Sequence, residues 1–178
     1  MKKLVLFFVV IANIVLSGCS GPAGVPGPEG PQGTALEAEV FELQNVNFAY
    51  DALNGYNLHQ ALNPQIFASD NLLIYRLSGT IDPQTPIWQS IPRTIYNSQG
   101  ELDYDFDFSK VDFTIYAGGN YDIALTPNYL NSQTFRIVII PGAFSNKGKN
   151  VDTRNYDAVI KTYRIDDTHV KVLDKNNF

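Results

Sequence analysis

The sequence predicts a mainly β domain, either a β-sandwich or a strongly curved antiparallel sheet, with one packed helix near the C-terminus. From Ala35 onward, short apolar and aromatic runs are separated by turn residues, and their hydrophobic period is mostly two. Helical spacing stands out only late in the chain. With a single cysteine, the fold depends on a hydrophobic core alone, and 178 residues suffice to form one. We therefore treat residues 35–178 as one globular domain.

Three segments in the first part of this domain predict strands. Val40–Phe48 alternates apolar with polar residues and predicts the first strand. Leu72–Leu77 is apolar almost throughout, which predicts a strand buried on both faces. Ile87–Ile95 is interrupted by Pro92, which has no backbone N–H to donate, so we expect a strand at a sheet edge or with a bulge.

A hairpin is the clearest local prediction. Asn97–Gly100 has the composition of a turn, and it leads into Glu101–Phe108, the most regular alternation in the chain. Two further strands are predicted by β-branched residues: Val111–Tyr116, which ends at a Gly118-Gly119 turn, and Phe135–Ile140.

One helix is predicted near the C-terminus. Its apolar and aromatic residues recur at i, i+3, i+4 and i+7: Tyr156, Val159, Ile160 and Tyr163. Asp152 or Thr153 could cap its N-terminus, and the helix should lie on the sheet. A short strand, His169–Leu173, would follow before a polar tail.

The N-terminus has the features of a secretory leader. Lys2 and Lys3 precede the apolar run Leu4–Val15, which is too short to span a membrane as a helix of about 20 residues. The sequence Leu16-Ser17-Gly18-Cys19 then matches the processing pattern of bacterial lipoproteins. That resemblance implies that residues 1–18 are a signal peptide and that Cys19 becomes the first mature residue.

The same resemblance implies that Cys19 carries lipid. Its sulfur would receive a diacylglyceryl group, and two or more acyl chains, such as palmitate, anchor a protein stably in a membrane where one does not. The alternative is an ordinary signal peptide followed by a free thiol. We favour the lipoprotein interpretation, because an exposed unpaired thiol would be a liability in an oxidising compartment.

Residues 19–34 form a spacer in which glycine returns at every third position from Gly21 to Gly33. This pattern is typical of a collagen triple helix, in which only glycine fits at the axis. The alternative is a stiff polyproline-like spacer that holds the domain about 35 to 40 Å from the membrane. We favour the spacer, because so few triplets contribute little against the entropy of associating three chains.

Charge and motifs exclude several classes of function. Removal of residues 1–18 leaves 11 basic against 18 acidic residues, a formal charge of −7. This balance disfavours nucleic acid or an anionic membrane surface as the main partner. The sequence has no phosphate loop, dinucleotide motif or Gly-x-Ser-x-Gly elbow, and we expect no cofactor. Its two histidines, His59 in a polar loop and His169 at a strand start, lack zinc-site spacing and are expected at the surface.

Three carboxylates form the one cluster that could carry chemistry. Alternation places Asp103, Asp105 and Asp107 on one face of a strand, about 6.6 Å apart, with Leu102, Tyr104, Phe106 and Phe108 on the other. They could form a calcium site completed by Asp112 or a loop carbonyl, or they could form a carboxylate pair for glycoside hydrolysis. We favour a solvated face, because calcium loops follow the third Asp with glycine and here Phe108 follows.

Tyrosine and tryptophan are abundant enough that some should lie near the surface, where they contact sugars or protein partners. For any single one of them, packing in the core is the more typical role. The residues are Tyr50, Tyr56, Trp88, Tyr96, Tyr116, Tyr121, Tyr129 and Tyr156.

As a whole, the chain resembles small Gram-negative lipoproteins with a collagen-like Gly-Pro spacer after the lipid cysteine and an uncharacterised β-rich domain. The segments that carry the resemblance are Leu16–Gly33, Asn45–Phe48, Ile66–Asp70 and Phe135–Pro141. The family implies no known activity. Ser20 after Cys19 suits sorting to the outer membrane, without deciding between its periplasmic and surface sides.

These observations predict an outer-membrane, lipid-anchored protein of the cell envelope. Its β domain would bind a protein or a glycan without catalysing a reaction. Two alternatives are a glycan hydrolase that uses the carboxylates and a structural trimer held by the collagen-like repeat. We expect a monomer.

Overall fold

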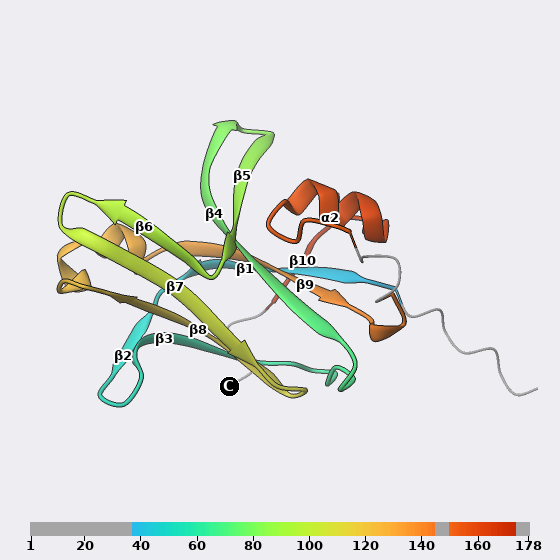
Figure 1. Ribbon diagram of the computed structural model, residues 1–178, viewed down its shortest axis with the longest axis horizontal. Helices are drawn as coiled ribbons and strands as arrows, with labels where there is room; N and C mark the ends of the chain where they lie inside the picture. The colour runs from blue at the N-terminus through green and yellow to red at the C-terminus, as the bar shows by residue number, and fades with distance from the viewer. Residues whose placement is uncertain (1–36, 145–149, 174–178) are drawn as a thin grey trace, which may run out of the picture. The chain divides into compact units, whose positions relative to one another are not determined.

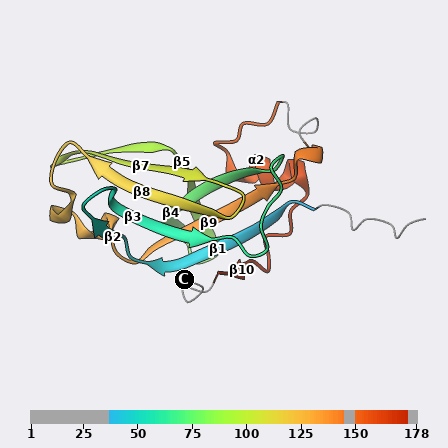
Figure 2. The same ribbon diagram turned by 90° about the horizontal axis from the view of Figure 1, so that it is seen from below.

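The computed structural model describes residues 37–144 and 150–173 and shows a β-sandwich with one α-helix on the outer face of one sheet (Figures 1 and 2). The predicted leader, the lipid site Cys19, the spacer and the polar tail lie outside the described residues. Among the described residues, no helix has the length and apolar character needed to cross a membrane. The predicted mainly β fold is confirmed.

Sheet A has five strands, in the order β10-β1-β9-β4-β5. Neighbouring strands are antiparallel, except that β10 runs parallel to β1. The bounds of the strands are Glu39–Val46 for β1, Asn71–Asp82 for β4, Thr85–Ile91 for β5, Gln133–Ile140 for β9 and Lys171–Val172 for β10. Residues 78–87, the outer half of the β4–β5 hairpin, are all exposed and project from the sandwich (Figure 1).

Sheet B also has five strands, in the order β2-β3-β8-β7-β6, and all its neighbours are antiparallel. Its strands are β2 (Ala49–Asp51), β3 (Gly55–Ala61), β6 (Arg93–Asn97), β7 (Gly100–Phe108) and β8 (Asp112–Gly119). Helical segments in the described part of the chain are α2 (Tyr156–Tyr163) and three short 3-10 turns, η1 (Ile123–Leu125), η2 (Pro127–Tyr129) and η3 (Gly142–Phe144).

Two cores hold these layers together. The first lies between the sheets and includes Leu72, Ile74 and Phe113. The second lies between sheet A and α2 and includes Tyr75 and Val159. Because alternate residues of β4 enter different cores, the prediction of a strand buried on both faces is confirmed. Complete burial of each such side chain contributes about 1.5–3 kcal/mol.

The segment around Pro92 differs from its prediction. It is not one strand with a bulge but two strands, β5 in sheet A and β6 in sheet B, and the chain changes sheets at Pro92. A central strand could not accommodate a residue without a backbone N–H, and both β5 and β6 lie at sheet edges. The predicted edge position is therefore confirmed, and the prediction of one continuous strand is wrong.

The predicted hairpin is confirmed in β6 and β7, where Asn97 pairs with Gly100. The Asn97 side-chain oxygen accepts hydrogen bonds from the backbone N–H groups of Gln99 at 2.8 Å and Gly100 at 3.2 Å. Gly100 has a φ of +146°, which favours glycine at this turn.

A second hairpin, β2–β3, was not predicted. His59 lies on β3, so the expected polar loop is wrong, but its side chain is exposed, as expected. Asn54-Gly55, a typical hairpin signal, stands at the turn, and Gly55 has a φ of +69°. The Asp51 carboxylate accepts from the backbone N–H groups of Leu53 and Asn54 there. The short β2 and the polar outward residues of β3 concealed this pattern.

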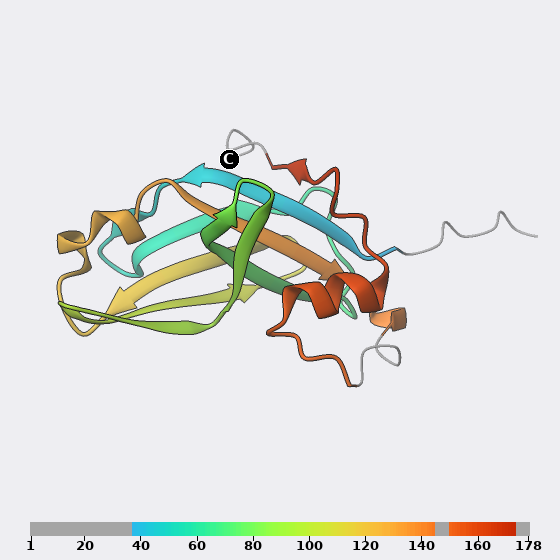
Figure 3. The same cartoon turned by 90° about the horizontal axis from the view of Figure 1, so that it is seen from above.

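The predicted helix is confirmed as α2, and it lies on sheet A (Figure 3). Its N-cap is neither Asp152 nor Thr153. The side chain of Asn155 accepts a hydrogen bond from the backbone N–H of Ala158 at 3.1 Å, whereas Asp152 forms an ion pair with Arg154. The last predicted strand is present as the two-residue β10, which starts after His169.

Gly118 and Gly119 were expected to form a turn, but they are the last two residues of β8. A Cβ added at Gly119 would lie 2.5 Å from the carbonyl oxygen of Glu101 and 2.8 Å from a methyl carbon of Ile123. Nothing lies within 4 Å of a Cβ added at Gly118. The strand therefore needs glycine at Gly119 for close packing and not at Gly118.

We expect Gly119→Ala to lower the free energy of unfolding by about 1–3 kcal/mol, because its new methyl group meets backbone that cannot move freely. The matched control, Gly118→Ala, should change it by less than about 0.5 kcal/mol. Urea unfolding followed by circular dichroism measures both values. Equal effects of the two substitutions would contradict this packing.

Buried tyrosines give a second prediction, at alkaline pH. The hydroxyl of Tyr104 donates to the carbonyl oxygen of Tyr129 inside the sandwich, and burial raises the pKa of Tyr104 to about 12. Burial also raises the pKa values of Tyr75 and Tyr156. In the unfolded chain tyrosine ionises near pH 10. Between about pH 10 and 12 the unfolded state has lost protons that the folded state keeps, so the free energy of unfolding falls as pH rises.

Urea unfolding at several pH values from 8 to 11 tests this expectation. Tyr104→Phe should reduce the loss of stability above pH 10, whereas Tyr96→Phe, at a tyrosine that is 76% exposed, should leave it unchanged. If Tyr104→Phe has the same pH dependence as the wild type, Tyr104 does not contribute to it.

Candidate functional site

A groove opens between the sheets at one end of the sandwich. Ala38, just before β1, and Val40 on β1 are buried in the core against α2. Glu39 and Phe41 alternate with them along the strand, so their side chains face the space between the sheets. Glu39 is exposed and Phe41 is half-buried. Because a charged side chain stands on the inner face here, the layers do not close, and a cavity of about 940 Å³ remains.

One wall of this groove is the segment 62–70 between β3 and β4. The backbone N–H groups of Leu62 and Ile66 donate to the carbonyl oxygens of Val111 and Lys110, at 2.7 and 2.9 Å. At its other end, the Asp70 carboxylate accepts from the backbone N–H groups of Phe67 at 2.9 Å and Gly142 at 3.2 Å. Hydrogen bonds on both sides therefore fix the wall.

The groove combines amide, charged and aromatic side chains. Phe67 stands on the wall with 62% of its surface exposed, and the Lys171 ammonium lies 5.9 Å from the centre of the Phe41 ring. The amides of Gln60, Asn63 and Gln65 and the carboxylates of Glu37, Glu39 and Asp70 complete the polar lining. A concave site with apolar surface and a few polar groups is typical of ligand binding.

A smaller apolar cavity of about 320 Å³ lies between β1 and the β2–β3 hairpin, lined by Leu43, Val46, Ala49 and Leu58 among others. Gln60 lines both this cavity and the groove. Gln60 is therefore the residue of β3 that lies between the two spaces.

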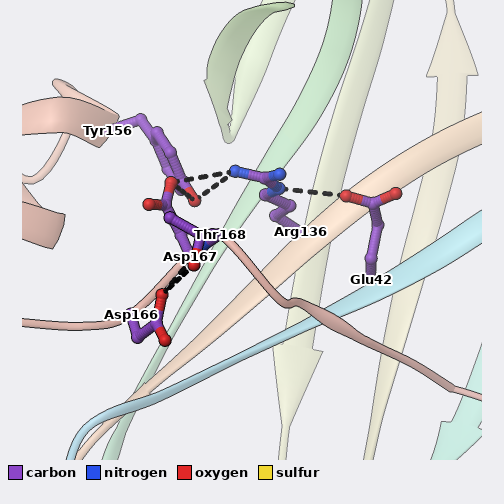
Figure 4. A network of polar contacts seen from close by, with 6 residues as sticks. All are labelled: Glu42, Arg136, Tyr156, Asp166, Asp167 and Thr168. Carbon is purple, nitrogen blue, oxygen red and sulfur yellow. Dashed lines mark hydrogen bonds and ion pairs between the residues drawn. The ribbon is translucent and has the colours of Figure 1, made fainter.

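Figure 4 shows a separate polar network around Arg136 on β9. The guanidinium forms ion pairs with Glu42 at 3.0 Å and Asp167 at 3.2 Å, and it lies 4.4 Å from the centre of the Trp88 ring. The Tyr156 hydroxyl, which accepts from Arg136, donates to Asp167 at 2.9 Å. These contacts raise the pKa of Arg136 against the effect of burial. The network joins β1, β9, α2 and the segment after α2. Its role is therefore structural.

Arg76, buried at the opposite end of the sandwich from the groove wall, forms no ion pair with any carboxylate of the described residues. Its Nε donates to Gln133 at 2.8 Å, and its guanidinium lies 5.0 Å from the ring of Tyr104 and 5.6 Å from that of Tyr129. Gln133 in turn donates to the carbonyl oxygens of Asn128 and Asn131. Arg76 thus fixes the loop that closes this end.

The predicted alternation on β7 is confirmed. Asp103, Asp105 and Asp107 are exposed on the outer face of sheet B. The carboxylate of Asp107 accepts from the Tyr116 hydroxyl at 2.9 Å, and Asp112 accepts from the Ser109 hydroxyl instead of joining the row. Across the described ranges, no group of three or more His, Cys, Asp or Glu side chains is arranged to hold a metal ion.

The structure also places the aromatic residues. Tyr50 and Tyr96 are 67% and 76% exposed, so the expectation that some tyrosines lie near the surface is confirmed, whereas Tyr156 is buried. None of the eight aromatic residues singled out above lines the groove. Its aromatic side chains are Phe41 and Phe67, which sequence reasoning missed, although Phe67 lies in the segment 66–70 noted for its resemblance.

Comparisons with known proteins add no evidence on this site. A scan against protein-family models, a search of curated proteins and a search of solved structures found no match.

We expect Arg136→Ala to lower the free energy of unfolding by about 3 kcal/mol, because it leaves the partly buried carboxylates of Glu42 and Asp167 without the cation that neutralises them. The control is Arg154→Ala, which removes an ion pair whose arginine side chain is 83% exposed and should cost less than about 1 kcal/mol. Chemical denaturation of both variants measures the difference. Similar losses would contradict a structural role for the network.

Proposed function

We propose that this chain is a lipid-anchored protein of the bacterial outer membrane whose β-sandwich binds a protein or glycan partner in the cell envelope and catalyses no reaction. The observation that carries the proposal is the groove between the sheets, with its exposed Phe67 and its three amide side chains. Two further parts of the proposal are inferred from the sequence: Cys19 anchors the chain, and the spacer holds the domain away from the membrane.

The groove suits binding because its walls are fixed before a ligand arrives. The hydrogen bonds of Leu62, Ile66 and Asp70 hold the wall on both sides, so little conformational entropy is lost on association. Its volume of about 940 Å³ falls at the upper end of the range for ligand sites, which leaves room for part of an extended molecule.

The charge of the groove narrows the class of partner. Among the described residues, Glu37, Glu39 and Asp70 line it together with a single cation, Lys171. This excess of negative charge favours a neutral or basic ligand over an anionic one. The acidic balance of the whole mature chain acts in the same direction.

The alternative of a carboxylate-dependent hydrolase is less well supported. A general acid in glycoside hydrolysis needs a pKa raised by burial, together with a concave site around the scissile bond. Asp103, Asp105 and Asp107 are exposed on the outer face of sheet B. The trimer alternative depends on the spacer, which lies outside the described residues.

The test uses the full chain extracted in detergent. Its binding is measured to an array of bacterial envelope glycans and to envelope proteins captured on a biosensor. For a ligand found there, the double substitution Gln65→Ala and Phe67→Ala should weaken binding by about tenfold or more, because it removes a hydrogen-bonding amide and an exposed aromatic contact. Isothermal titration calorimetry measures the dissociation constants.

Two controls separate the groove from the other surfaces. Tyr96→Ala removes an aromatic ring that is 76% exposed on β6 and should leave affinity unchanged. Replacement of Asp103, Asp105 and Asp107 by Asn should also leave it unchanged. If the groove variant binds as tightly as the wild type, the groove is not the site, and loss of glycan cleavage in the triple variant would support the hydrolase.

A further inference from the structure

The edge of β3 is only partly covered by its neighbour. β2 pairs with β3 over Gly55–Asn57, whereas β8 pairs with its other side from Tyr56 to Ala61. Over Leu58–Ala61, no strand of the described residues pairs with the edge that faces away from β8. Backbone N–H and C=O groups on such an edge can pair with another chain.

The apolar cavity runs along this open edge. Four successive residues of β3 line it: Asn57, Leu58, His59 and Gln60. Because successive strand residues point to opposite faces, a space that borders all four must follow the edge of the strand. At about 3.3 Å per residue, an edge of this length matches about four residues of an extended peptide.

Apart from Asn47, the residues that line the cavity outside β3 are apolar. Leu43 and Val46 on β1 face it, and Ala49 on β2 stands at the end where the β2–β3 pairing starts. An apolar cavity of about 150 Å³ is enough to bind benzene. At about 320 Å³, this one has room for a large aliphatic or aromatic side chain.

Gln60 supplies a polar group beside this cavity. Its side chain is only 4% exposed, and its Nε2 donates to the carbonyl oxygen of Ala61 at 3.1 Å. Its Oε1 accepts no hydrogen bond from a described residue. In the described ranges, the one side-chain N or O atom that is fully enclosed and has no partner is Trp88 Nε1. The Gln60 Oε1 is therefore not fully enclosed, and solvent reaches it. A nearly buried acceptor that no protein group satisfies favours a ligand with an N–H donor next to an apolar group.

A peptide in extended conformation has all three features that this site requires. Its backbone can pair with the edge of β3, alternate side chains can enter a pocket beside that edge, and it carries an N–H at nearly every residue. In the groove, which shares Gln60 with the cavity, Glu37 and Glu39 favour basic side chains. A glycan would match the amides but not the strand edge.

We propose that the partner is a protein that adds an extended, basic segment as a further strand along Leu58–Ala61, with one large apolar side chain in the cavity beside Gln60. This inference rests on the proposed function and names the class of its partner. Affinity comes from backbone hydrogen bonds, and selectivity comes from the cavity and the acidic groove.

The first experiment selects random heptapeptides by display against the full chain in detergent. We expect the recovered peptides to share one large apolar residue and an excess of Lys and Arg. Ala49→Leu, which places a side chain in the cavity, should weaken their binding at least tenfold. The matched control, Ala52→Leu, changes an exposed alanine of the nearby loop that does not line the cavity and should leave binding unchanged.

The second experiment uses the wild-type chain and therefore does not depend on a variant that folds. Each N–H of a recovered peptide is methylated in turn. Strand addition predicts that methylation at alternate positions abolishes binding, because only every other N–H of an added strand points to the edge it pairs with. Equal tolerance at all positions would overturn strand addition.

The remaining outcomes are also distinguishable. If no peptide is recovered but a glycan binds the groove, the inference fails and the proposed function stands. If peptides bind and Ala49→Leu has no effect, the cavity is not their site and the inference fails. If neither peptide nor glycan nor envelope protein binds, both proposals fail.

Discussion

The orientation of β1 is the constraint on which the candidate site depends. Val40 packs in the core beneath α2, and Glu42 pairs with Arg136 at 3.0 Å, so the outer face of β1 is held from one side. Since side chains alternate along a strand, Glu39 and Phe41 must then face sheet B. A register shift of one residue would bury Glu39 under the helix. The helix layer and the Arg136 network therefore determine that the sandwich stays open at this end.

Much of the architecture followed from local patterns. The alternation of Glu101–Phe108, the turn at Asn97–Gly100 and the helical spacing from Tyr156 to Tyr163 each depend on neighbouring residues, and each is confirmed. The errors arose where tertiary context decides. Gly118 and Gly119 have turn composition but continue β8, because Gly119 packs against the backbone of Glu101. At Pro92 the chain passes from one sheet to the other. The segment therefore forms two strands instead of one.

The candidate site could not be predicted in the same way. Its residues come from segments around positions 37–41, 60–70, 139–141 and 171–173. The pairing of β1 with β9 and β10 brings three of these segments together, and the hydrogen bonds of Leu62, Ile66 and Asp70 fix the segment 60–70 beside them. No local pattern indicates that Phe67 is exposed on a fixed wall or that Gln60 is nearly buried. The acidic residues of β7 could be predicted because alternation alone arranges them. The sequence therefore predicts the carboxylate cluster, which a single strand creates. It does not predict the groove, which several strands form together.

The edges of the two sheets are protected unequally, and this difference supports a binding role for β3. Pro92 stands directly before β6, and β10 covers β1 at Phe41 and Glu42. Such devices prevent pairing between the sheet edges of different molecules. Over Leu58–Ala61 the sequence has no proline, no lysine and no covering strand among the described residues. An edge left open beside an apolar cavity is an aggregation hazard, so its retention is best explained if a specific segment pairs with it.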